Sequence, residues 1–518
     1  MSTLTLIAAF PLGTYYGHRS DGSVEAFPTP ARLHAALLSA AALGPHSEAG
    51  KLSDAALQAL WWLEKHPPTG LFQPNTVDLD PSRERRSYRD VGTFAKDTKT
   101  KVVRKKIEDR PISDGVAISA PFGFVWNDVP DDIRKTLIAI AADIPYLGES
   151  HSVAIVTAGE VEPNLLLSPT ANCFTPEAHA RQVPTEGRTD TLIEAYNEQY
   201  GKRSVPKSQY KFKQSQAPLS EIPTQSCTTE AWYEPAQLPT STDSPWSIAY
   251  LFSLNATIEK RDRVTLCTRM HKALISLLSF GAAPIITGKY NQEVRQPANR
   301  LAIQYLTPQL SQLLGLRGPH LALFVPTGTS PSDLAQIRKS VEISQIWSKR
   351  IGRIDVSFTG STRSASYFWP APKPGCLRIW ETEMPIIPET RIVKRGTRTW
   401  TLGDSALLSA GFVWRDRFST EGSRQARYRL LRDQVEQQGM QVLATHPVTR
   451  NARNYAHHTH ASVPVQPYHA VIDLGALSNT QAAVMLGQSR HLGSGLLKPI
   501  DVNPASLESI GELLGGVK

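Results

Sequence analysis

Cysteine is scarce in this chain of 518 residues, and its four cysteines are scattered without paired spacing at Cys173, Cys227, Cys267 and Cys376. This spacing excludes a disulfide framework and a cysteine-rich zinc site, and it fits a reducing compartment. Hydrophobic runs long enough to cross a bilayer are also absent from the sequence. The first residues alternate like a strand and soon meet a proline and a glycine, which is not the pattern of a secretion signal. We therefore expect a soluble, cytoplasmic protein with no membrane partner.

Positive charge is present in excess and is unevenly distributed. The formal net charge is +9, and the segment 83–110 holds eleven Lys/Arg against five Asp/Glu. Its clearest basic residues lie near its end, at Arg104, Lys105, Lys106 and Arg110. A second basic run, over 202–213, is interleaved with aromatic residues. Cations for phosphates with aromatics for stacking are typical of proteins that bind single-stranded nucleic acid, although a solvated loop is the alternative for either segment.

Hydrophobic patterning in the first third predicts alternating strands and helices. Residues 4–9 and 117–126 are strand-like, and a helix is predicted from Thr29-Pro30 to Leu43. A second helix begins at Pro130, because its apolar residues keep a spacing of four and three, and a strand is predicted over 152–157. The polar, basic tract 70–115 between them is predicted to be an extended hairpin or loop. This order is typical of a ferredoxin-like unit.

The pattern is interrupted and then restarts. Residues 166–245 lack periodicity and are predicted to be a linker or a large insertion. Beyond them the sequence predicts strands and helices in two further rounds: strands 246–254, 320–326, 410–414 and 468–474, and helices 262–279, 331–348 and 421–438. We therefore predict an α+β protein of tandem ferredoxin-like (RRM-like) units with antiparallel sheets, divided into domains 1–165 and 246–518 around the segment 166–245.

A glycine-rich segment near the C-terminus, 487–499, has the clearest chemical character. Gly493 and Gly495 allow close approach of the backbone to phosphate, while Arg490, His491 and Lys498 supply donors and charge. The segment lacks the Lys-Ser/Thr of a P-loop and the third glycine and following helix of a dinucleotide-binding motif. A purely structural turn between strands is the alternative.

Three kinds of histidine are candidates for function. His271 lies on the predicted helix 262–279 between Arg269 and Lys272, where an imidazole can move protons while cations hold a phosphate; a boundary histidine without a role is the alternative. His469 lies in a predicted strand and is either functional or a satisfied core or edge residue. The cluster around His457, which includes His458 and His460, has no nearby cysteine or carboxylate, so a mobile polar loop is favoured over a metal site. We expect no metal and no cofactor.

Three sequence islands occur in order along the chain: Ala26-Phe-Pro-Thr-Pro-Ala-Arg-Leu-His-Ala-Ala-Leu, Tyr146-Leu-Gly-Glu-Ser-His-Ser-Val and Arg490-His-Leu-Gly-Ser-Gly-Leu-Leu-Lys-Pro. Together they resemble the fusion subunit of type I-G (formerly I-U) CRISPR systems. In that family a half of the Cas-five type, which caps the crRNA 5′ handle, is joined to a half of the Cas-six type, which cleaves the repeat. The resemblance implies ferredoxin-like units in both halves, a basic RNA-gripping hairpin at 83–110, a glycine-rich loop at 487–499 and a catalytic histidine near His271.

The resemblance also implies partners and chemistry. The partners would be pre-crRNA and mature crRNA, other backbone and large subunits of a Cascade complex, and target DNA indirectly. The reaction would be metal-independent RNA cleavage giving a 2′,3′-cyclic phosphate and a 5′-OH end, with His271 as general acid or base and His469 and His491 as reserves for the second proton. The chain departs from the family where Lys289 and Arg300 stand in place of common histidines. A non-catalytic crRNA-binding scaffold, or a general RNA-binding protein, remains the alternative.

Overall fold

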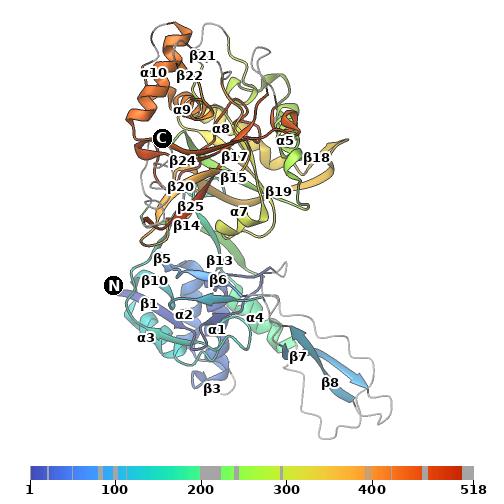
Figure 1. Cartoon of the computed structure of the whole chain (residues 1–518). Coiled ribbons are helices and arrows are strands. Elements are labelled where there is room, and N and C mark those ends of the chain that lie inside the picture. The colour runs from blue at the N-terminus through green and yellow to red at the C-terminus, as the bar shows by residue number, and fades with distance from the viewer. Residues whose placement is uncertain are drawn as a thin grey trace. The chain divides into compact units, whose positions relative to one another are not determined.

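A computed structural model describes residues 2–19, 23–48, 51–79, 86–96, 103–111, 114–198, 223, 225–237, 244–291, 296–390, 394–395, 398–419, 421, 423–457 and 465–504. Side chains are not described for 86–96, 103–111, 280, 394–395, 398–399 and 424–425. The chain forms two compact units (Figure 1). The first unit comprises residues 1–172 and 178–238, and the second unit comprises 173–177 and 239–518.

The first unit is built on a seven-stranded sheet in the order β11-β1-β10-β5-β12-β14-β13. Its strands are β1 (Ser2–Ala9), β5 (Gly70–Phe72), β10 (Phe122–Val129), β11 (Ile155–Ala158), β12 (Leu165–Leu167), β13 (His179–Pro184) and β14 (Thr228–Pro235). Helices α1 (Pro30–Leu43) and α2 (Asp54–Lys65) follow β1, and α3 (Asp131–Ala141) follows β10. Counted along the chain, β5-β10-β1-β11 has the spatial order 2-3-1-4, and these neighbouring strands all pair antiparallel. This is the ferredoxin-like order that the sequence predicts.

Local sequence explains the helices of this unit. The Thr29 hydroxyl accepts a hydrogen bond from the Arg32 N–H, and Pro30 occupies the first turn, where a missing N–H costs nothing. In α3, Ile133, Leu137 and Ile140 are buried, as their spacing predicts. Both helices thereby cover the sheet with apolar side chains in one core.

Part of the segment 166–245 belongs to this first sheet. Strands β13 and β14 pair with each other, β14 pairs with β12, and α4 (Arg188–Tyr196) precedes β14. The sequence did not predict these strands, because buried and exposed side chains do not alternate regularly along them. In β14, only Tyr233 has a fully buried side chain. The predicted domain boundaries themselves stay predictions.

The basic tract contains the predicted hairpin. Strands β7 (Arg86–Lys96) and β8 (Val103–Pro111) pair antiparallel as a separate two-stranded sheet (Figure 1). At its base, β6 (Thr76–Asp78) and β9 (Val116–Ile118) pair with each other. The side chains of Arg104, Lys105, Lys106 and Arg110 lie outside the described residues, as does the whole basic run 202–213.

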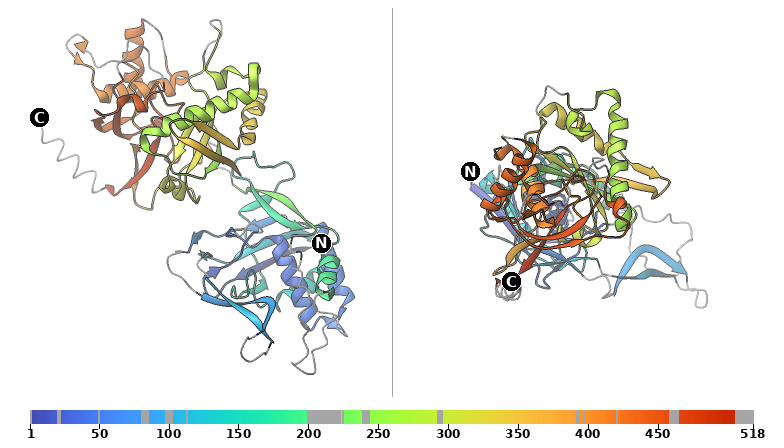
Figure 2. Two further views of the ribbon diagram at one scale, coloured as in Figure 1. Left: turned by 90° about the vertical axis from the view of Figure 1, so that its right-hand side faces the viewer. Right: turned by 45° about the horizontal axis from the view of Figure 1, so that its top comes forward.

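The second unit contains two more sheets, and in each of them four neighbouring strands have the same spatial order. The first is β16-β17-β15-β19-β18, from β15 (Trp246–Leu254), β16 (Ala302–Leu306), β17 (His320–Pro326), β18 (Gln345–Ser348) and β19 (Gly352–Ser364). Helix α5 (Arg263–Leu278) follows β15, and α8 (Pro331–Arg338) follows β17. The long helix α5, light green in Figure 2, packs against β16 and β18 of this sheet. The predicted helix 331–348 is wrong in its second half, because the chain turns at 339–342 and continues as β18.

The other sheet, β23-β24-β20-β25, is again 2-3-1-4. Its strands are β20 (Leu377–Thr382), β23 (Gln441–Pro447), β24 (Tyr468–Asp473) and β25 (Leu497–Val502). Helices α9 (Leu402–Val413) and α10 (Arg424–Gln437) precede β23, and the glycine-rich segment lies between β24 and β25, where a ferredoxin-like unit has its second helix. The α+β class with tandem ferredoxin-like units and antiparallel sheets is therefore confirmed.

The strand predicted over 410–414 is wrong, because these residues form the last turn of helix α9 and its C-cap residue. Thr401 and Asp404 form a reciprocal capping box at the start of α9. Residues 404–411 are all buried, so no polar face marks the helical period, and a short apolar run of this kind resembles a strand. Within the described part of the chain, no helix has the length and apolar character needed to cross a membrane.

Candidate functional site

The glycine-rich segment packs directly against α5. A Cβ atom on Gly493 would lie 2.9 Å from Cys267 Sγ and 3.2 Å from Val264 Cα, and Gly493 has a φ of +87°. A Cβ atom on Gly495 would lie 1.8 Å from the Leu486 carbonyl oxygen. Both glycines are thus needed for packing, and this supports the structural interpretation of these two positions.

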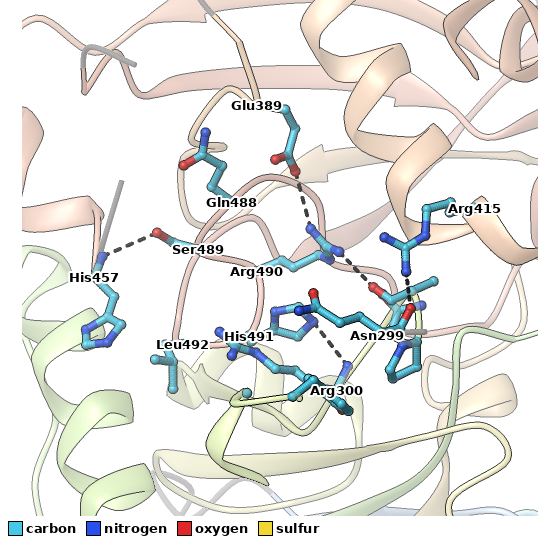
Figure 3. Close-up of a pocket in the computed structure, with 15 residues that line it drawn as sticks. Asn299, Arg300, Glu389, Arg415, His457, Gln488, Ser489, Arg490, His491 and Leu492 are labelled. Carbon is cyan, nitrogen blue, oxygen red and sulfur yellow. Dashed lines mark hydrogen bonds and ion pairs between the residues drawn. The ribbon is translucent and has the colours of Figure 1, made fainter. Parts of the chain in front are cut away.

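A pocket with a volume of about 330 Å³ opens beside this packed loop (Figure 3). Its walls come from the residues that follow helix α6 (Pro284–Thr287), from the approach to β16, and from the glycine-rich segment. The lining is polar and basic, and its charged or titratable members are Tyr290, Arg300, Glu389, Arg415, His457, Arg490 and His491.

Arg490 is fixed inside the protein. Its guanidinium donates to the carbonyl oxygens of Gly487 at 3.1 Å and Ala298 at 2.9 Å, and to Glu389 Oε1 at 3.3 Å. Burial raises the pKa of Glu389 to about 7, while the Arg490 charge opposes that rise. Arg490 therefore holds the loop and a buried carboxylate, and its Nη atoms are already engaged rather than held ready for a phosphate.

His491 is buried and neutral. Its Nε2 accepts a hydrogen bond from the Arg300 N–H at 3.3 Å, and its own carbonyl accepts from the Ile303 N–H. Burial first, and then Arg490, Arg300 and His271, hold the pKa of His491 well below its usual range. A histidine of this kind positions the backbone before β16 and is a poor proton donor at neutral pH.

His271 lies next to the pocket rather than in its lining. Its Nε2–H donates to the Ile286 carbonyl at 2.7 Å, which leaves the lone pair on Nδ1. Burial lowers the pKa of His271, and Arg300 and Lys272 lower it further, against the hydrogen bond to Ile286. Lys272 is exposed on the same helix, and Arg269 is half-buried. At neutral pH the His271 ring is thus an uncharged base.

A second imidazole reaches the same face of α5. His457 Nδ1 lies 3.3 Å from Thr268 Oγ1, and the His457 N–H donates to Ser489 Oγ at 3.3 Å (Figure 3). Thr268 lies one helical turn before His271, and residues three apart on a helix are neighbours. His457 is exposed. Sequence reasoning assigned it to a loop, because only the fold brings residues 457 and 268 together; His458 and His460 lie outside the described residues.

Tyr290 and Arg300 complete the site, and neither was a candidate from composition. The Arg300 guanidinium lies against Gly288, where a Cβ atom would come within 1.5 Å of Arg300 Nη1. Tyr290 Oη is buried and makes no hydrogen bond to any described residue. Arg300 stands where the resembling family commonly has a histidine, and that departure was the only sequence signal for it.

His469 and Lys498 lie elsewhere, on the sheet β23-β24-β20-β25. Lys498 Nζ pairs with Glu381 Oε2 at 3.0 Å, and His469 Nδ1 lies 2.8 Å from Thr382 Oγ1. The structure therefore brings His271, His491 and Arg490 together and leaves these two residues outside. Across the part of the chain that is described, no group of three or more His, Cys, Asp or Glu side chains is placed to hold a metal ion.

Among known proteins, no protein-family model and no curated protein matches this chain. Solved structures similar to it include "CRISPR associated protein Cas6", with 12% identity and a TM-score of 0.27, and a histidine-to-alanine mutant of Cas6, with 14% identity and a TM-score of 0.26. Each comparison covers 49% of this chain and 99% of the other. At such TM-scores the likeness carries no argument about activity.

Proposed function

We propose that this chain is a CRISPR RNA-processing subunit of the type I-G kind, in which a crRNA 5′-handle-capping half is fused to a repeat-cleaving half. In this proposal it cleaves pre-crRNA within the repeat, holds the crRNA ends, and assembles with backbone and large subunits of a Cascade complex in the cytoplasm. Three ferredoxin-like units, the basic β7–β8 hairpin and the sequence islands support it.

One observation carries the proposal: His271 of α5 lies one helical turn from Thr268, which His457 contacts, beside a guanidinium-lined pocket. RNA cleavage without a metal needs a base for the ribose 2′-OH, an acid for the leaving 5′-oxygen, and positive charge on the phosphate. His271 Nδ1 is uncharged at neutral pH and is our candidate base. His457 is our candidate acid, and Arg300 is our candidate for the charge on the phosphate.

The test is incubation of the full-length protein with its repeat RNA in EDTA. The proposal predicts one specific cut that leaves a 2′,3′-cyclic phosphate and a 5′-OH end. Cleavage should require the 2′-OH, so RNA carrying a single 2′-deoxy nucleotide at the cut site should bind and stay intact. Cleavage of that RNA, or cleavage that depends on added metal, would contradict the mechanism.

The runner-up is a scaffold that binds processed crRNA without cleaving it. It is favoured by one observation, namely that Lys289 and Arg300 replace histidines common in the family. The same incubation distinguishes the two functions: tight, repeat-specific binding without a cut would identify the scaffold. Equal binding of the repeat and of unrelated hairpins would contradict both.

A further inference from the structure

A second basic cluster lies on the sheet β23-β24-β20-β25, on the face away from α9. Strand β24 alternates between buried Tyr468, Ala470 and Ile472, which share a core with α9, and half-buried His469, Val471 and Asp473. Glu381 pairs in register with Val471, and Lys498 pairs with Glu381. His469 and Lys498 therefore lie on the face of this sheet that is opposite to α9.

Lys260, from the short turn Lys260–Asp262 before α5, reaches this face. Its Nζ lies 3.1 Å from His469 Nε2. His469 Nδ1 is 3.2 Å from the Thr382 carbonyl, to which it can only donate, so Nε2 bears the lone pair and accepts from the Lys260 ammonium. A neutral acceptor leaves the positive charge of Lys260 unbalanced, and among the described residues no carboxylate lies within ion-pair distance of it.

The surrounding charges leave the cluster with a positive excess. Arg263 pairs with Glu383 at 2.7 Å, and Lys498 pairs with Glu381 at 3.0 Å and with Glu383 at 3.7 Å. Three cations thus face two carboxylates. Desolvation first, and then Arg263 and Lys498, lower the pKa of Lys260, against the opposing effect of Glu383 and Glu381. An anion bound at this cluster would relieve that repulsion.

We propose that Lys260, His469 and Lys498 form a second phosphate site, which holds a phosphodiester of the RNA strand away from the cleavage pocket. This inference rests on the proposed function for the identity of the strand. It assigns His469 and Lys498 to binding, because neither residue lies in the lining of the pocket beside His271.

The test measures affinity and cleavage separately, with the full chain, repeat RNA and an oligouridylate of about twelve nucleotides. Lys260→Ala and His469→Ala should weaken binding of both RNAs by roughly 3- to 10-fold, and Lys260→Ala should reduce the slope of log Kd against log salt by roughly 0.7. At limiting protein, single-turnover cleavage by both variants should slow in proportion to their loss of affinity. Glu381→Gln should tighten binding, because it releases Lys498. Lys339→Ala, which removes an exposed lysine outside the cluster, is the matched control.

The outcomes separate this site from the proposed function. Unchanged affinity and salt slope in Lys260→Ala and His469→Ala would overturn the second site, and so would a large loss of saturated cleavage rate in His469→Ala with normal binding. If the wild type neither prefers nor cleaves the repeat, but oligouridylate binding still depends on Lys260, the proposed function fails and the phosphate site stands.

Discussion

At the residue scale, the buried pair of Arg490 and Glu389 shows how a motif residue can look functional and be structural. Arg490 and Glu389 side chains are 10% and 12% exposed, and the guanidinium also ties together two loop carbonyls. Such a pair is costly to break, because one charge is left alone in the interior, whereas replacement of both partners by apolar residues is often tolerated.

We predict that Arg490→Met lowers the free energy of unfolding by about 3–5 kcal/mol, and that adding Glu389→Leu restores much of it. Chemical denaturation of the full chain measures both. If Arg490→Met instead left stability intact and weakened only RNA binding, Arg490 would be a phosphate ligand after all.

Gly495 is constrained by its surroundings as well as by its backbone. It has a φ of +70°, and an added Cβ would meet the Leu486 carbonyl oxygen. Gly315 has a nearly identical φ of +71° with nothing within 4 Å of the same position. We predict that Gly495→Ala costs at least about 3 kcal/mol of stability, while the control Gly315→Ala costs about 1 kcal/mol. Equal costs, measured by thermal unfolding, would show that the close contact is absent.

His34 makes the first unit sensitive to acid. It is buried in α1, its Nε2 lies 3.3 Å from Thr189 Oγ1, and burial followed by the charge of Arg188 lowers its pKa to about 3. Between pH 6.5 and 3 the unfolded chain binds a proton at this ring and the folded chain does not. The free energy of unfolding therefore has its full value above the pKa that His34 has in the unfolded chain. It decreases as the pH falls through this window, by up to about 1.4 kcal/mol per pH unit.

We predict that His34→Gln flattens this dependence, because glutamine does not titrate. Urea unfolding of the full chain at about pH 7.5 and about pH 5.0 compares the variant with the wild type. The same loss of stability on acidification in both proteins would assign the effect to other groups.

At the element scale, sequence pattern predicted the parts with a clear period and missed those without one. Helix α3 and strands β15, β17 and β24 were predicted because their apolar residues recur regularly or form runs bounded by turns. The end of helix α9, residues 410–414, was predicted to be a strand, because the helix is buried on almost every side and shows no polar face. For the site, His271 and His491 were each candidates from the sequence, but His457 and Tyr290 reach it only through tertiary contacts, which leave no trace in local sequence.

The β7–β8 hairpin allows an element-scale test. Among the described strands, β7 and β8 pair with each other and with no third strand. Removal of the hairpin should therefore leave the rest of the first unit folded. We predict that deletion of residues 83–112 weakens RNA binding and makes it less salt-dependent, with the melting temperature nearly unchanged. Substitution of Arg104, Lys105 and Lys106 by serine is the matched control that keeps the backbone. Normal affinity in both variants would exclude the hairpin from RNA binding.

At the scale of the whole molecule, four neighbouring strands in each of three described sheets have the order 2-3-1-4. A ferredoxin-like sheet has one face without helices of its own. In the sheet β16-β17-β15-β19-β18 that face is buried in a core shared with the sheet β23-β24-β20-β25. The chemistry that we propose is confined to the second unit, where α5, the approach to β16 and the glycine-rich segment converge. This division fits a protein that binds RNA with many parts and cleaves it at one.

The most direct test of that account is the single-turnover rate of repeat-RNA cleavage in EDTA by wild type, His271→Ala and His469→Ala. We predict that His271→Ala slows cleavage by roughly 10²–10⁴-fold with RNA affinity nearly intact, and that His469→Ala cleaves at the wild-type rate once saturated. An unchanged rate in His271→Ala would remove the α5 pocket from the chemistry and contradict the account.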